Sequence, residues 1–208
     1  MDTLIFFIFS LAVLIFSVII HEIAHGSVAL ALGDPTAKDA GRLSLNPLKH
    51  LDPFGSVILP ISLFIITQGQ GPIFAWAKPV PINSLNFRDR KWGILKVSLA
   101  GVVANFSTGL FFCLIIRFLN LPLSLLIPFS FIAFYNFILA VFNLIPLPPL
   151  DGSHILFSFL PEKWSNIKII IQQYGFLILI LLITFGSNWI FNLAVIFYHF
   201  FSGKGFLG

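Results

Sequence analysis

The chain has 208 residues, of which 58% are hydrophobic and only 10% are charged. Globular chains carry about 25% charged residues, so this composition excludes a soluble domain and predicts a polytopic membrane protein. The net charge of +4 comes from basic residues that lie mainly between apolar segments. We therefore attribute it to membrane topology and expect no nucleic-acid partner.

Six hydrophobic segments are separated by turn-forming residues. They cover residues 4–31, 54–67, 94–119, 123–145, 166–186 and 188–201. The second of them has 14 residues with Pro60 near its middle, which predicts a re-entrant piece and not a full span. We expect an all-α polytopic membrane protein with about five full transmembrane helices. It forms one membrane domain over 1–208, with a catalytic core at 4–160 and a C-terminal helical hairpin at 161–208.

The first segment contains the motif His21-Glu22-Ile23-Ala24-His25. Residues i and i+4 share a helix face, so the two imidazoles have the spacing that a zinc site on one helix needs. Glu22 is placed to act as general base for a metal-bound water. Ionisable groups in a span are costly unless they are paired or coordinated. The alternative is that both histidines hydrogen-bond to other helices and Glu22 is protonated.

The stretch between residues 70 and 86 is rich in proline. Pro79 and Pro81 forbid a helix there and favour an extended edge strand or a small β-hairpin at the cytosolic face.

A second acidic residue, Asp151, follows the prolines that end the segment 123–145. It is the best available oxygen donor for a third zinc ligand, although a carboxylate at this position also suits a helix N-cap. To reach the depth of the histidines, Asp151 must be separated from them by an even number of crossings. The segments 94–119 and 123–145 supply two, so 54–67 must dip in and return.

With this topology, eleven of the 12 basic residues lie on one side of the membrane, and only Arg117 lies on the other. The eleven are Lys38, Arg42, Lys49, Lys78, Arg88, Arg90, Lys91, Lys96, Lys163, Lys168 and Lys204. Because positive charge marks cytoplasmic loops, we expect a multi-pass protein of the cell membrane, the inner membrane where there are two. Its N-terminus lies outside and its motif toward the cytosol.

With His21 to His25 in the first segment and Asn143 to Gly152 far downstream, the chain resembles the site-2 protease family of intramembrane zinc metalloproteases, in its short prokaryotic form. The similarity covers about residues 15–160. The matching stretches are His21 to His25, Asn46 to Pro53, Trp76 to Pro81, Asn86 to Arg88, Ala100-Gly101 with Asn105, and Asn143 to Gly152. Two places depart from the family pattern: Val102 stands where the family usually has proline, and His154 where it often has arginine.

The resemblance implies one zinc ion per chain, bound by His21, His25 and Asp151, with Glu22 as catalytic base. It also implies that Asn143 helps to hold the substrate or the developing oxyanion, whereas an interhelical hydrogen bond is its alternative role. Asn105 is expected to serve packing or substrate contact. His154 is expected to be an interfacial cation or a partner of the ligands, and His50 and His199 to lie at the surface.

The implied activity is zinc-dependent endopeptidase cleavage of membrane-spanning substrates, as in regulated intramembrane proteolysis. Expected partners are membrane proteins with a single transmembrane segment, the lipid bilayer and a regulatory membrane protein. Two other classes remain open: a non-catalytic relative that binds membrane helices, and a metal or proton transporter. A transporter needs polar groups through the whole bilayer, and a non-catalytic relative has no need of Glu22.

Overall fold

The computed structural model describes residues 3–70, 73 and 75–206, and the regular elements within these ranges are helices. The α-helices are α1 (Thr3–Ala31), α2 (Thr36–Asp39), α3 (Leu59–Ile66), α4 (Arg90–Phe118), α5 (Leu123–Asn143), α6 (Asp151–Phe159) and α7 (Ser165–Ser202). A π-helical turn at Pro53–Ile58 leads directly into α3, and 3₁₀ turns cover Pro47–Lys49, Ser84–Asn86 and Glu162–Trp164.

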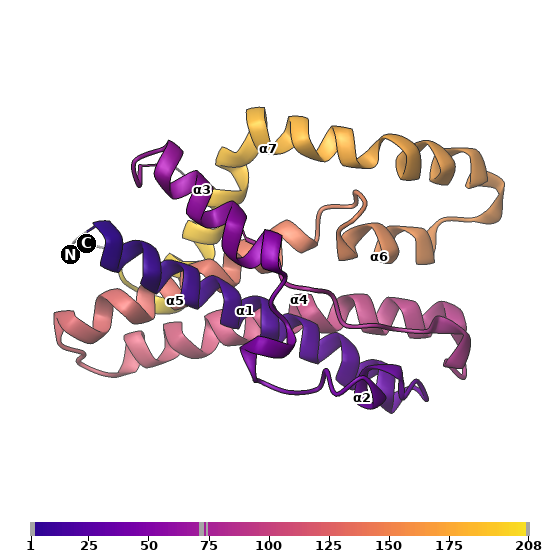
Figure 1. Cartoon of the computed structure of the whole chain (residues 1–208), viewed down its shortest axis with the longest axis horizontal. Coiled ribbons are helices and arrows are strands. Elements are labelled where there is room, and N and C mark those ends of the chain that lie inside the picture. Colours follow the sequence, from indigo (N-terminus) through magenta and orange to yellow (C-terminus); the bar gives the residue numbers. More distant parts are fainter. Residues whose placement is uncertain (1–2, 71–72, 74, 207–208) are drawn as a thin grey trace.

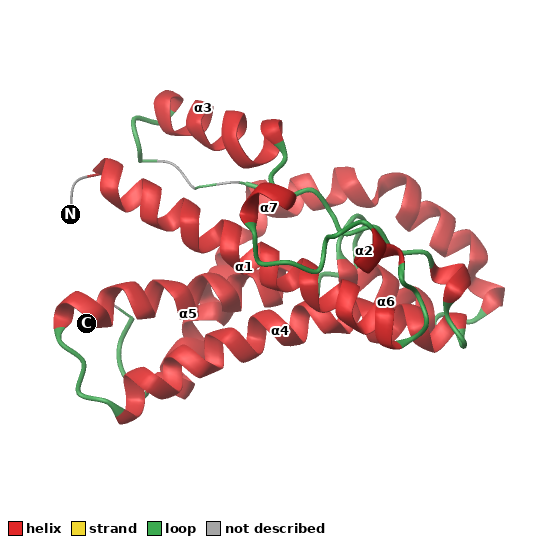
Figure 2. Ribbon diagram, turned by 60° about the horizontal axis from the view of Figure 1, so that its bottom comes forward, coloured by secondary structure: helices red, strands yellow, loops and turns green. Residues whose placement is uncertain are grey.

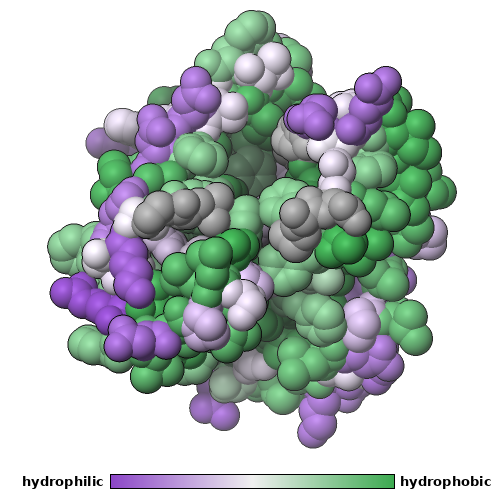
Figure 3. Space-filling model, turned by 90° about the vertical axis from the view of Figure 1, so that its left-hand side faces the viewer, coloured by the Kyte–Doolittle hydropathy of each residue, from purple (hydrophilic) through white to green (hydrophobic). Residues whose placement is uncertain are grey.

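Four of the described helices, α1, α4, α5 and α7, are long and apolar enough to cross a membrane. A span needs about 20 apolar residues, and even the shortest of the four has 21. Large apolar side chains point outward from these helices, among them Ile8, Phe111 and Phe176, each more than half exposed. Figure 3 shows apolar side chains over much of the face that it presents. The prediction of a polytopic helical membrane protein is therefore confirmed.

The centre of the fold is a bundle in which α4 packs against both α1 and α5 (Figures 1 and 2). Small residues allow this close approach: a Cβ atom at Gly109 would lie 2.9 Å from the Phe137 ring. Near the end of the bundle where α1 begins and α7 ends, Cys113, Phe137 and Tyr198 belong to one buried cluster from α4, α5 and α7. This packing fixes the depth of α4 and α5 relative to each other.

The C-terminal region differs from the predicted helical hairpin. The expected break between 166–186 and 188–201 is absent, and α7 runs as one helix of 38 residues. Gly186 lies inside this helix, where glycine lowers helix stability by only about 1 kcal/mol relative to alanine. Figure 1 shows that α7 changes direction along its length, so that its yellow second half turns back against the bundle.

The course of α7 also changes the predicted side of the membrane for one basic residue, Lys204. Since α7 contains no hairpin turn, its last residues lie beside the start of α1 (Figure 1). Arg117 donates from Nη1 to the Phe200 carbonyl at 3.3 Å and to the Phe201 carbonyl at 3.4 Å. Lys204 follows closely and therefore shares the end of Arg117, not the end of the other basic residues.

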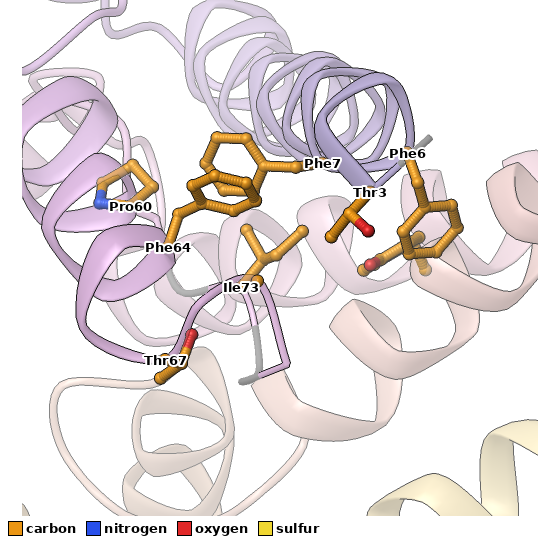
Figure 4. A pocket seen from close by; sticks show the side chains of 9 residues that line it. Thr3, Phe6, Phe7, Pro60, Phe64, Thr67 and Ile73 are labelled. Atoms are coloured by element: carbon orange, nitrogen blue, oxygen red, sulfur yellow. The ribbon is translucent and has the colours of Figure 1, made fainter. Parts of the chain in front are cut away.

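The short segment around α3 dips along the bundle and returns. Figure 4 shows Phe64 of α3 lying against Phe7 of α1, with ring centroids 4.3 Å apart, beside a cavity of about 120 Å³. The returning chain then meets the start of the segment: Trp76 N–H donates to the Gly55 carbonyl at 3.2 Å, and Lys78 N–H to the His50 carbonyl at 2.8 Å. Entry and exit thus lie at one level, as the re-entrant prediction requires.

The predicted β-hairpin is not found among the described residues. The stretch around Lys78 to Asn83 is extended, but its only ladder contact in the described chain is an isolated antiparallel bridge between Leu51 and Ala77. Pro79 and Pro81 have no N–H to donate, so the backbone cannot continue a ladder. Beyond the Lys78 N–H, this backbone bonds to the side chains of Glu22, Asp34 and Arg42 instead.

Candidate metal centre

Helix α1 presents the two motif histidines on its buried face. His21 and His25 are each 6% exposed, and their rings meet edge to face with centroids 4.4 Å apart. Their Nε2 atoms lie 2.9 Å from each other. The i, i+4 spacing therefore does what the sequence predicts and directs two ring nitrogens to one point.

Asp151 reaches the same point from the other side of the bundle. Its Oδ2 lies 3.1 Å from Nε2 of His21 and 3.1 Å from Nε2 of His25. Asp151 is the first residue of α6, and the N-cap is Leu150, with no side-chain capping bond. A Cβ at Gly152 would lie 2.4 Å from the Leu144 and Ile145 carbonyl oxygens, so only glycine lets the chain fold back here. Of the two roles weighed for Asp151, the geometry favours the one beside the histidines.

Helix α4 supports both imidazoles along one face with a spacing of four residues. The carbonyl of Val97 lies 2.7 Å from Nδ1 of His25, and Oδ1 of Asn105 lies 2.7 Å from Nδ1 of His21. Between them, a Cβ at Gly101 would lie within 2.5 to 2.6 Å of both rings. The Ala100-Gly101…Asn105 pattern therefore reads as a support for the histidines.

These contacts place a proton on Nδ1 of each imidazole. A backbone carbonyl only accepts hydrogen bonds, so Nδ1 of His25 must donate to Val97. Asn105 Nδ2 donates to the Ser17 carbonyl at 3.1 Å, which turns its Oδ1 toward His21. A neutral imidazole with a proton on Nδ1 has a lone pair on Nε2. When both imidazoles are neutral, as metal ligands must be, two lone pairs converge on Asp151 Oδ2, a buried oxygen with no hydrogen-bond partner among the described residues.

A convergence of three buried acceptors is unfavourable unless a cation lies among them. Two nitrogens and one oxygen match the ligand chemistry of a catalytic zinc site, in which three protein ligands leave a position open. The residues present therefore fit a zinc ion.

Glu22 lies beside the cluster on the same helix. A carboxylate oxygen of Glu22 lies within 4.8 Å of a ring nitrogen of each histidine. Its Oε2 accepts a hydrogen bond from the Val80 N–H at 2.7 Å. Arg42, which is 8% exposed, donates from Nη2 to the carbonyls of Lys78 and Pro79 and holds this extended segment in place. The segment predicted to be an edge strand thus borders the candidate base.

The other predicted residues are placed as follows. Asn143 is the last residue of α5, and its Nδ2 donates to the Leu139 carbonyl of the same helix at 3.0 Å. Within the described chain, no hydrogen bond joins Asn143 to the histidines or Asp151. His154 and His199 are exposed. His50 was expected at the surface, but it is fully buried and its Nε2 lies 2.8 Å from the Ser44 carbonyl.

Sequence reasoning missed Ser17 and Asn136, and it gave Asn105 only a packing or substrate role. All three are buried and connected to His21 by hydrogen bonds. A signal existed for each, since a polar residue in an apolar span needs a partner inside the bundle. The partners themselves lie on other helices and cannot be read from the chain order.

A membrane-embedded centre of this kind defines a class of polytopic metal-dependent hydrolases. Comparison with known proteins agrees with it. The family model for peptidase family M50 matches residues 121–182. The chain is 37% identical over 178 residues to YwhC of Bacillus subtilis, named a candidate zinc metalloprotease, covering 81% of this chain and 77% of YwhC. It is 32% identical over 206 residues to Rip2 of Mycolicibacterium smegmatis, which has the same kind of name, covering 97% of this chain and 77% of Rip2.

A zinc metalloprotease of Methanocaldococcus jannaschii is 27% identical over 128 residues, 58% of this chain and 38% of that protein. No solved structure matches the chain at a comparable level. The extent of the likeness to YwhC and Rip2 shows that the chain belongs to peptidase family M50, the site-2 protease family. The predicted family and the predicted class of enzyme, a metalloendopeptidase, are thereby confirmed.

Proposed function

We propose that this protein is an intramembrane endopeptidase that uses one zinc ion per chain, held by His21, His25 and Asp151. The observation that carries the proposal is the meeting of two imidazole Nε2 atoms and one carboxylate oxygen within 3.1 Å of one another. Helix packing places these three acceptors together at a cost that a divalent cation offsets. The names of the related zinc metalloproteases support the choice of zinc.

A zinc ion held by these residues would supply two effects, polarisation of the scissile carbonyl and a lowering of the pKa of its bound water to about 7. Glu22 accepts a proton from the attacking water and returns it to the leaving amine. The Val80 N–H holds one carboxylate oxygen of Glu22 and so fixes the direction in which the base points. Asn143 remains a proposed substrate or oxyanion contact. Its Nδ2 donates one N–H to the Leu139 carbonyl and has a second N–H that could donate to an oxyanion, whereas its Oδ1 could accept only from a substrate N–H.

An intact substrate helix hides its carbonyls in i→i−4 bonds, so it must be unwound before cleavage. The extended segment from Lys78 to Asn83 offers backbone next to Glu22 for pairing with an unwound substrate. Expected substrates are single-span membrane proteins, with a regulatory membrane protein as a further partner.

We further propose that the N-terminus lies outside the cell membrane and that the metal centre opens toward the cytosol. Ten basic residues remain on that side after the reassignment of Lys204, against two on the other, in agreement with the positive-inside rule. Water then reaches the centre from the cytosolic side.

Purified protein in detergent provides the test. We expect one equivalent of zinc per chain and cleavage of a transmembrane substrate by the parent. Glu22→Gln should keep the metal and lose cleavage, because it removes the base but no ligand. His21→Ala should lose both. Cleavage by Glu22→Gln at the parental rate would refute the assigned base, and full zinc content in His21→Ala would refute the assigned ligand. Zinc binding without any cleavage, in parent and variants alike, would favour a transporter or a binding protein.

A further inference from the structure

A chain of buried amides extends from His21 into the centre of the bundle. Asn105 of α4 and Asn136 of α5 are both 0% exposed, and Ser17 of α1 is 3% exposed. Asn105 Nδ2 donates to the Asn136 Oδ1 at 2.9 Å, in addition to its bond to the Ser17 carbonyl. Side chains and backbone from three helices therefore meet in one hydrogen-bonded group. Its member on α1, Ser17, lies one helical turn before His21.

The direction of every bond in this group is fixed. Asn136 Nδ2 donates to the Ile132 carbonyl at 2.9 Å and to Ser17 Oγ at 2.9 Å. Because the Ile132 carbonyl can only accept, Asn136 cannot turn its amide round, and its Oδ1 must face Asn105. Asn105 is oriented in turn by two acceptors, the Asn136 oxygen and the Ser17 carbonyl. Its own Oδ1 then has one partner, Nδ1 of His21, at 2.7 Å.

The consequence reaches the candidate ligand atom. With Asn105 Oδ1 as acceptor, His21 must carry a proton on Nδ1, which leaves the lone pair on Nε2 directed at His25 and Asp151. A reversed amide would present N–H groups to Nδ1 and favour the other tautomer, with a proton on Nε2 in the position of the ion. The partner that holds the second ring nitrogen decides the tautomer and the orientation of a ligating histidine.

We propose that Asn105 and Asn136 are positioning residues that hold His21 in the tautomer and orientation needed to bind the metal. This inference rests on the proposed zinc centre. It gives α5 two tasks at the site, because the same helix carries Asn136 in its middle and leads through the proline turn to Asp151. Neither asparagine touches substrate or the reacting atoms.

The test measures zinc affinity by competition with a chromophoric chelator, together with thermal unfolding of the metal-free protein. Asn105→Leu keeps the approximate size of the side chain and removes the acceptor, and we expect zinc affinity to fall about 10- to 100-fold. Asn136→Leu should cost less, because the Ser17 carbonyl still orients Asn105. Position 136 is fully buried, so the new carboxyl group in Asn136→Asp stays protonated. It keeps a carbonyl oxygen facing Asn105 Nδ2 and an O–H for the Ile132 carbonyl, and it should keep affinity near the parental value. Asn192→Leu, at an exposed position of α7, is the matched control.

Unchanged zinc affinity in Asn105→Leu would overturn the proposal, even if its metal-free form unfolds at a lower temperature. The proposal is also overturned if Asn136→Asp loses as much zinc affinity as Asn136→Leu. If Asn105→Leu does not fold, the comparison of these two Asn136 variants provides the test. A parent that binds no zinc would overturn the proposed function and the positioning role together. Tight binding by the parent and by all three variants at positions 105 and 136 would overturn the positioning role alone.

Discussion

Gly101 is the position at which the smallest change should damage the centre most selectively. It lies on α4 between the two contacts that hold the imidazoles. The Cβ of an alanine there would lie 2.5 Å from His21 Cε1, 2.6 Å from His21 Nδ1 and 2.6 Å from His25 Nε2. Non-bonded carbon atoms prefer about 3.5 to 4.0 Å. Gly101→Ala therefore requires the rings or the helix to move by roughly 1 Å.

The size of the effect follows from this displacement. Overpacking costs about 1–3 kcal/mol in stability, and the gain in helix propensity from glycine to alanine, about 1 kcal/mol, offsets part of it. A misplacement of about 1 Å at a catalytic centre can cost on the order of 100-fold in rate. We therefore expect Gly101→Ala to lower cleavage roughly 100-fold, with a stability loss of no more than about 2 kcal/mol.

Gly109→Ala is the matched control, because it lies two turns further along the same helix. There a Cβ would lie 2.9 Å from the Phe137 ring and 3.0 Å from the Ala133 carbonyl oxygen, away from the histidines. It gains the same helix propensity and also overpacks. Cleavage assays and zinc affinities of both variants should separate them. Equal activity in the two would refute the reasoning that Gly101 makes room for the imidazoles.

Three further changes test other parts of the structure. Gly152→Ala should prevent the close approach to the 144 and 145 carbonyls and displace Asp151, so zinc affinity should fall at least 10-fold; parental affinity would show that this backbone contact is dispensable. Burial raises the pKa of Asp34, but hydrogen bonds from Thr36, Asn83 and Asn86 outweigh burial and hold that pKa below its usual value. The stabilisation from Asp34 is then complete above about pH 4 and is lost as the pH falls through the lowered pKa. In thermal unfolding, the melting temperature of Asp34→Asn should therefore fall less at acid pH than that of the parent. Identical pH profiles of the two proteins would contradict the assigned role of Asp34. Arg42→Met should remove the hydrogen bonds to the Lys78 and Pro79 carbonyls and disorder the segment next to Glu22. Cleavage of a transmembrane substrate should then fall more than zinc content. An equal loss of cleavage and zinc would instead indicate that the whole metal centre is disrupted.

Local patterns in the chain predicted most of what depends on local physics. Apolar runs predicted the spans because backbone groups in lipid must bond within a helix. The i, i+4 motif predicted two imidazoles on one face because the helical repeat is fixed. Counting membrane crossings predicted that Asp151 returns to the depth of His21, and Asp151 Oδ2 lies 3.1 Å from His21 Nε2.

Errors arose where a local signal competed with tertiary packing. Gly186 to Asn188 has turn-forming residues, yet a helix continues through them, since turn propensity is weak against packing along α7. That continuation moved Lys204 to the opposite end. Pro79 and Pro81 correctly excluded a helix, but an extended backbone becomes a hairpin only if a second strand pairs with it, and Glu22 and Arg42 bond to it instead.

The sequence by itself determined the membrane setting, the family and the candidate ligands, because hydropathy, helical spacing and residue chemistry are all properties of neighbouring positions. Only the tertiary structure decided which amides support His21, why Gly101 and Gly152 carry no side chain, and that Val80 holds Glu22. Each of these depends on contacts between helices far apart in the chain. Their register is set by side-chain packing and by the need of every buried polar group to find a partner.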